Sequence, residues 1–121
     1  MRGAQGGRFD ALVARLREAV LGGPGVTRPG LRQAVEARAA ALSGRVGAAG
    51  EGDTGGGLPD DLAAFADRVA GGAWRVTPEE VEALLEAGYS EEEVFEVTVS
   101  AALGAGCGRL ERGLAAVRGE V

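Results

Sequence analysis

The sequence predicts an all-α protein: a helical bundle with a long central helix rich in glycine and alanine, preceded by a two-helix N-terminal arm. Three observations support this fold class. Apolar residues recur at helical spacing in several segments. Two capping boxes mark the starts of helices. No segment shows the alternation of apolar and polar residues that is typical of a half-buried β-strand.

Residues 1–43 predict the two helices of the N-terminal arm. The first helix is indicated by apolar residues at helical spacing, namely Phe9, Leu12, Val13, Leu16 and Val20. The run GGPG at 22–25 is expected to end it. Thr27 is expected to cap the second helix, with Pro29 in the first turn, where the missing N–H costs nothing. The inner stripe of this helix would be formed by Leu31, Val35 and Leu42.

Residues 44–57 predict a flexible linker. Seven of these fourteen positions are glycine, and a stretch of this composition costs too much backbone entropy to form a regular element. The compact helical domain is therefore expected over 58–121.

The first helix of this domain is expected just after Leu58. Pro59 and two aspartates suit its first turn, because carboxylates are stabilised at the positive end of a helix dipole. Its inner side would carry Leu62, Phe65 and Val69.

Two further helices are predicted by their capping boxes, Thr77 with Glu80 and Ser90 with Glu93. The earlier of the two would end at Gly88, and the later one would run to about residue 118. The inward residues of the earlier helix would be Val81, Leu84 and Leu85.

The last predicted helix is apolar on nearly all sides. One stripe holds Phe95, Val99, Leu103, Gly106, Leu110, Leu114 and Val117, and the opposite side holds Val94, Val97, Ala101, Gly104, Ala105 and Gly108. Such a helix is typical of the middle of a bundle. Glycine is a poor helix former, so its repeated use here predicts close approach of another backbone.

Cys107, the only cysteine, lies at the border of the main stripe. Apolar surroundings favour the neutral thiol, whereas reactivity needs the thiolate. The sequence offers no second cysteine and no histidine, so a packing role is favoured over a reactive thiol. For the same reason we expect no metal site and no cofactor, since metal sites need several converging nitrogen or sulfur ligands.

The formal net charge of −5 argues against a nucleic-acid partner, because a phosphate backbone is held mainly by an excess of basic residues. The charge is unevenly spread. Residues 1–57 carry eight arginines and five acids, a net +3, whereas residues 58–121 carry five arginines and thirteen acids, a net −8. Neither a signal peptide nor a membrane-spanning run is evident. We therefore expect a cytoplasmic protein with no membrane partner.

The run VEALLEAGYSEEEVFEVTVSAALGAGCGRLERGL, within 58–117, resembles the carboxymuconolactone decarboxylase and AhpD-like alkylhydroperoxidase superfamily. The resemblance implies an all-α fold that assembles into homo-oligomers. It also implies where the peroxidase branch would carry its CxxCxxxH motif, which falls on 73–80. Ala73 and Val76 stand at the two cysteine positions and Glu80 at the histidine position, so thiol peroxidase activity is not expected.

The decarboxylase branch of this superfamily does not depend on a cysteine pair, so acid–base chemistry stays open. The candidate catalytic residues are Glu80, Arg75, Arg109 and Tyr89. Each also has a structural interpretation: Glu80 as half of a capping box, Arg75 as a surface cation, Arg109 in an internal pair and Tyr89 as a packed turn residue. Trp74 is expected to anchor the core.

Two functions therefore compete at this point, and a third, a one-cysteine peroxidase, is the least favoured. The first is an oligomeric helical protein that works by association. The alternative is a cysteine-free enzyme of the decarboxylase, isomerase or lyase type that acts on a small organic acid, lactone or carbonyl compound. A pocket lined by Trp74, Arg75, Glu80 and Arg109 would favour the enzyme, because such chemistry needs an enclosed site with convergent polar groups.

Overall fold

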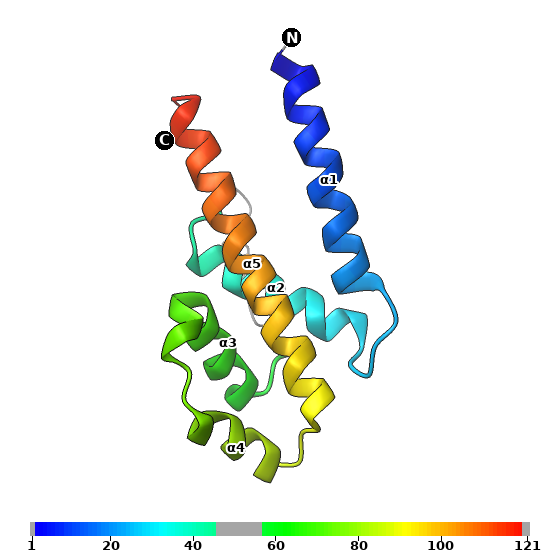
Figure 1. Cartoon of the computed structure of the whole chain (residues 1–121), viewed down its shortest axis with the longest axis vertical. Coiled ribbons are helices and arrows are strands. Elements are labelled where there is room, and N and C mark those ends of the chain that lie inside the picture. The colour runs from blue at the N-terminus through cyan, green and yellow to red at the C-terminus, as the bar shows by residue number, and fades with distance from the viewer. Residues whose placement is uncertain (1, 46–56, 120–121) are drawn as a thin grey trace.

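The computed structural model describes residues 2–45 and 57–119, with side chains from residue 10 onward, and all regular structure in these ranges is helical (Figure 1). The predicted all-α fold is confirmed. The elements are α1 (Arg2–Gly22), α2 (Pro29–Leu42), α3 (Asp60–Gly72), the 3-10 helix η2 (Ala73–Arg75), α4 (Pro78–Glu86) and α5 (Glu91–Val117). Most of the predicted linker, residues 46–56, lies outside the described residues.

The hydrophobic core lies where α2 and α3 pack against α5, and α4 contributes at one end. Its buried members are Val35, Ala39, Leu62, Phe65, Ala66, Val69, Ala70, Leu84, Val94, Val97, Ala101 and Ala105. All three residues predicted for the inner side of α3 are among them. Because α2 also supplies two members, the second helix of the arm is packed into the same core as the helices of 58–121.

α1 lies against α2 and α5 at one side of the molecule (Figure 1). Its end at Gly22 agrees with the predicted stop. The helix begins at Arg2, well before the first apolar residue of the expected stripe, Phe9. Three glycines precede Phe9, so local helix propensity does not explain this extension. Leu21 is the one buried hydrophobic residue among the described side chains of α1.

The turn between α1 and α2 corrects the predicted cap. Arg28, and not Thr27, occupies the N-cap position of α2, and its side chain makes no capping hydrogen bond. Thr27 is instead buried, and its N–H and hydroxyl donate to the Glu96 carboxylate of α5 at 2.9 and 2.5 Å. On the other side of the turn, the Arg32 guanidinium donates to two carbonyl oxygens at the end of α1, each at 2.7 Å. These long-range partners override the local capping preference of a threonine.

Leu42 does not belong to the inner stripe of α2, as the sequence predicted, because 61% of it is exposed. The buried side of the helix is centred instead near Glu36, with Val35 and Ala39 beside it. Leu42 lies about 120° round the helix from Glu36 at 100° per residue, so it points away from α5.

Both predicted capping boxes are confirmed. At α4 the Thr77 hydroxyl accepts from the Glu80 N–H at 3.2 Å, and the Thr77 N–H donates to the Glu80 carboxylate at 3.0 Å. Ser90 and Glu93 repeat this pair of bonds at α5, at 3.1 and 2.8 Å. Gly88 has a φ of +111°, which glycine adopts without strain, and this residue turns the chain out of α4 as predicted.

α5 contacts α1, α2, α3 and α4, in agreement with its predicted central place, but one of its sides is packed more closely than the other. We call the packed side the inner face, defined by Val94, Val97, Ala101, Gly104, Ala105 and Gly108, all buried. We call the opposite side the outer face, defined by Phe95, Val99, Ala102, Gly106, Leu110, Gly113 and Val117, all exposed or half-buried. Although α5 is apolar on both sides, no helix in the described part of the chain is long and apolar enough to cross a membrane.

The inner face explains two of the glycines of α5. A Cβ atom at Gly104 would collide with the carbonyl oxygen of Glu36, and one at Gly108 would lie only 2.5 Å from the carbonyl oxygen of Ala40. The predicted close approach of another backbone is therefore confirmed, and the helix that approaches is α2.

Candidate functional site

Glu80 is occupied by local contacts at the start of α4. Besides its capping bond to Thr77, its carboxylate pairs with Arg68 of α3 at 2.7 Å. The Thr77 N–H, with a further contribution from Arg68, holds the pKa of Glu80 below its usual range. A carboxylate with a lowered pKa is a weaker base, so these contacts suit a structural role better than general-base catalysis.

Tyr89 and Arg109 each bind one neighbour on α3. The Tyr89 hydroxyl donates to the Asp61 carboxylate at 2.9 Å, and burial together with Asp61 raises the pKa of the phenol. The Arg109 guanidinium donates to the carbonyl oxygen of Ala70, near the end of α3, at 2.7 Å. Arg109 is exposed, so it needs no buried carboxylate, and its observed partner is a backbone group.

Arg75 and Trp74 lie together on η2, at the surface. The guanidinium carbon of Arg75 is 4.8 Å from the centre of the Trp74 ring. Trp74 is 80% exposed, so the prediction that it anchors the core is wrong. Ala73, at the first of the superfamily's cysteine positions, is exposed, and Val76, at the second, is half-buried against the core.

The three hollows considered below all border α1, and none of them is lined by Glu80, Arg75, Arg109 or Tyr89. The structure therefore does not bring the candidate catalytic residues together at these hollows.

The sequence reasoning missed a charged network under α1. The Glu36 carboxylate, whose side chain is 2% exposed, accepts two hydrogen bonds from Arg17 at 3.1 Å and a bond from Arg45 at 3.0 Å. Arg45 also binds Glu111 of α5 at 2.9 and 3.0 Å. The network ties α1, α2 and α5 together and forms part of the lining of a hollow between α1 and α2.

One sequence signal could have revealed this network. Glu36 stands one residue from Val35 and three from Ala39, so a helical projection places its charge within the apolar side of α2. A buried carboxylate needs a positively charged partner, and arginine is the only basic residue in this sequence. Which arginines come close depends on the tertiary fold and could not be inferred from spacing.

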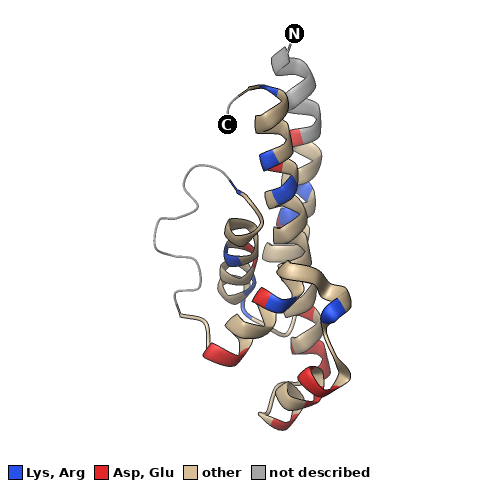
Figure 2. Ribbon diagram, turned by 90° about the vertical axis from the view of Figure 1, so that its left-hand side faces the viewer, with Lys and Arg blue, Asp and Glu red and all other residues tan. Residues whose placement is uncertain are grey.

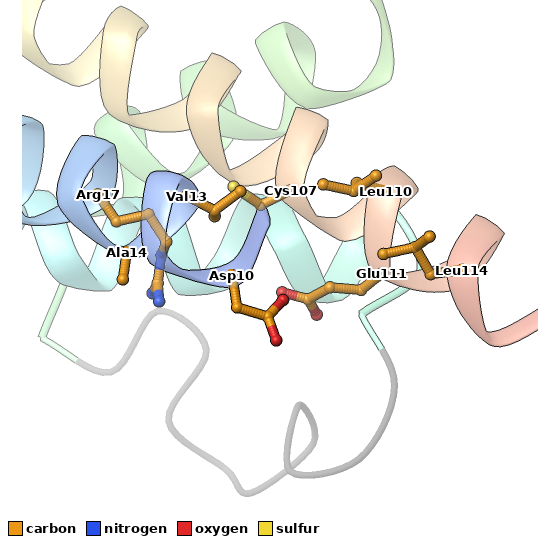
Figure 3. Close-up of a pocket in the computed structure, with 8 residues that line it drawn as sticks. All are labelled: Asp10, Val13, Ala14, Arg17, Cys107, Leu110, Glu111 and Leu114. Atoms are coloured by element: carbon orange, nitrogen blue, oxygen red, sulfur yellow. The ribbon is translucent and has the colours of Figure 1, made fainter. Parts of the chain in front are cut away.

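Cys107 lines a hollow of about 150 Å³ between α1 and α5 (Figure 3). Val13 lies beside the cysteine, and Asp10 and Glu111 point to one side of the hollow (Figure 3). The thiol is buried, and burial, with the nearby Glu36 carboxylate, raises its pKa. A raised pKa disfavours the thiolate, in agreement with the packing role favoured from the sequence.

A second hollow, of about 280 Å³, lies further along the seam between α1 and α5. Ala19 and Val20 of α1 face Phe95 and Val99 of α5 across it. The apolar side of α1 therefore runs beside the outer face of α5, and α1 adds two leucines that are about half exposed, Leu12 and Leu16.

The outer face carries three of the exposed large apolar residues of the described chain. Phe95 is 67% exposed, Leu110 44% and Val117 83%. Leu12 and Leu16 add two exposed apolar side chains on α1. Single exposed apolar residues are normal, but several on one face of a helix are typical of an interaction site.

Charge is separated along the same direction. α5 begins at the end of the molecule where α4 lies and runs towards the opposite end (Figure 1). Its first three residues are glutamates, whereas Arg109, Arg112 and Arg118 occupy its second half and its end. Figure 2 shows acidic residues gathered around α4 and the start of α5, and arginines further along α5.

Comparison of the chain with protein-family models, with curated proteins and with solved structures found no match.

Proposed function

We propose that this chain is a helical protein that works by self-association through the outer face of α5 and the exposed leucines of α1, and that it is not a thiol peroxidase. It would be a carboxymuconolactone decarboxylase and AhpD-like protein without the redox pair, because Ala73 and Val76 stand at the cysteine positions. The observation that carries the proposal is the apolar outer face, which its own chain leaves exposed.

A second copy of the chain is the partner that best fits this surface. The outer face lies on a helix that is acidic at its start and basic towards its end, so a reversed copy offers the opposite charge at each end. The oligomeric habit of the resembled superfamily points to the same partner.

The alternative, an acid–base enzyme, has weaker support. Glu80 has a lowered pKa and two local partners, and the Tyr89 hydroxyl is bonded to Asp61. Catalysis would need these groups to converge on a substrate, and each is instead engaged with a neighbouring helix.

Light scattering at micromolar concentration tests the proposal, with the expected mass that of two chains. Leu110→Glu, on the outer face, should yield a folded monomer, because a buried carboxylate without a partner opposes association. Leu42→Glu is the matched control, since it changes an exposed leucine of α2 outside this surface. This control should remain a dimer.

A monomeric wild-type chain would refute self-association. Equal loss of the dimer in Leu110→Glu and Leu42→Glu would refute the assignment to the outer face. Circular dichroism of each variant shows whether it is folded, and Leu110→Ala provides a milder change if the glutamate variant is not.

A further inference from the structure

We infer that the two copies cross antiparallel along α5 with Gly106 against the partner's Gly106, an arrangement that rests on the self-association proposed above. Three features of the outer face carry this inference: the order of its side-chain sizes, the open space at Gly106 and the direction of its charges.

Side-chain sizes on the outer face are complementary about Gly106. Phe95 and Val117 lie eleven residues to either side of it, Val99 and Gly113 lie seven, and Ala102 and Leu110 lie four. In an antiparallel pair centred on Gly106, Val99 meets the partner's Gly113 and Leu110 meets the partner's Ala102. Val99 and Leu110 then each have a small residue opposite, which is how packed helices interdigitate. Phe95 meets the partner's Val117 at each end of the contact.

A parallel pair would lose this complementarity. Each residue would then meet its own counterpart, so that Leu110 faces the partner's Leu110 and Gly113 faces the partner's Gly113. Crowding at the large residues would hold the helices apart and leave voids at the small ones, and both effects are destabilising.

Contacts within the described part of the chain do not explain why residue 106 is a glycine. A Cβ atom built at Gly106 or at Gly113 has no neighbour within 4 Å, in contrast to Gly104, where it would strike α2. A glycine inside a helix destabilises it relative to alanine. Close approach of a second backbone at Gly106 would offset this cost, as α2 does on the inner face.

Charge favours the same orientation. The antiparallel pair places Glu93, thirteen residues before Gly106, about level with the partner's Arg118, twelve residues after it. It also opposes the two helix dipoles favourably. A parallel pair would bring acidic ends together, and like charges in contact are unfavourable.

Spin-label distances test the orientation. Ala116 is exposed on α5, outside the outer face as defined, so Ala116→Cys in a Cys107→Ser background can carry one label per chain. Ten residues separate position 116 from Gly106, so the antiparallel pair predicts labels about 30 Å apart at 1.5 Å rise per residue. A parallel pair predicts less than about 20 Å, since packed helix axes lie about 10 Å apart.

Light scattering on the same samples separates the two proposals. A monomer refutes the proposed function. A dimer with the short label distance refutes the antiparallel arrangement and leaves self-association standing. A dimer with the long distance supports both.

Gly106→Leu tests the close crossing at its centre. The variant adds apolar surface, which would strengthen a loose hydrophobic contact, but it should raise the dissociation constant roughly tenfold or more if two glycine backbones meet there. Gly71→Leu is the matched control, because Gly71 is also exposed and helical with open space around its Cβ position. Unchanged or tighter association of Gly106→Leu overturns the crossing.

Discussion

The two faces of α5 are built from the same kinds of residue and yet have different surroundings. Each combines large apolar side chains with glycines in the middle of the helix. On the inner face, a Cβ atom at Gly104 or Gly108 would strike the backbone of α2, whereas one at Gly106 on the outer face would have no neighbour within 4 Å in the described part of the chain. A helix that is apolar all round therefore need not be surrounded by its own chain.

The difference shows how the fold selects its packed side. The inner face has its small residues where α2 crosses, so two backbones come close and the dispersion contacts are dense. The outer face carries the bulkier Phe95 and Leu110, which would hold α2 further away. The small residues of α5 lie at its contact with α2, and larger apolar residues are left exposed on its outer face.

The largest expected effect comes from the charge on the inner side of α2. Glu36→Gln should lower the free energy of unfolding by about 3 kcal/mol, because it leaves Arg17 and Arg45 without their buried countercharge. Urea unfolding measures the loss. Glu111→Gln removes the other partner of Arg45 at a carboxylate that is 40% exposed, and about 1 kcal/mol or less is expected. Equal losses would mean that the burial of Glu36 contributes nothing.

A minimal pair of glycine variants tests the comparison of faces directly. Gly104→Ala should destabilise the chain by about 2 kcal/mol, since its new methyl group meets a rigid backbone oxygen of α2. Gly106→Ala should instead stabilise the dilute monomer by up to about 1 kcal/mol, through helix propensity alone. Urea unfolding of both variants below the dimer's dissociation constant gives the signs, and the same sign for both would contradict the distinction.

The smallest expected effect concerns Glu96, at the edge of the outer face. The Thr27 hydroxyl, with the N–H groups of Thr27 and Val26, holds the pKa of Glu96 below its ordinary value of 4.5. A carboxylate whose pKa is lower in the folded state than in the unfolded state stabilises the fold at pH values above its unfolded-state pKa. This contribution is lost as the pH falls through its folded-state pKa. Glu96→Gln should cost about 1 kcal/mol at pH 7.

The difference between wild type and Glu96→Gln should shrink as the pH falls below 4.5. Thermal unfolding from pH 7 to pH 3 measures it. A difference that is constant with pH would show that the carboxylate charge is not what binds the turn.

The sequence predicted structure well where the contacts join residues that are close in the chain. The capping boxes at Thr77 and Ser90 need only three-residue spacing, and both formed. The inner side of α3 followed from one stripe of large apolar residues on a helix whose other residues are small or charged. These predictions succeeded because they depend on residues within one helix or at its start, which lie close together in the sequence.

Several predictions that depended on distant partners failed. Thr27 is a good cap by residue type, but Glu96, sixty-nine residues away, takes its hydroxyl and its N–H. Trp74 was expected to anchor the core, and η2 leaves it at the surface. On α5, apolar periodicity could not decide which side is packed, because both sides carry it. The network around Glu36 was missed because its arginines come from two other segments.

α1 is fastened near one end. Among its described side chains, Leu21 is the buried hydrophobic one, and Arg32 binds the carbonyl oxygens of Val20 and Gly23 beside it. Further from this anchor, an ion pair between Arg17 and Glu36 links α1 to α2. We therefore expect local opening of α1 to start away from this anchor, while the core of α2, α3 and α5 stays folded.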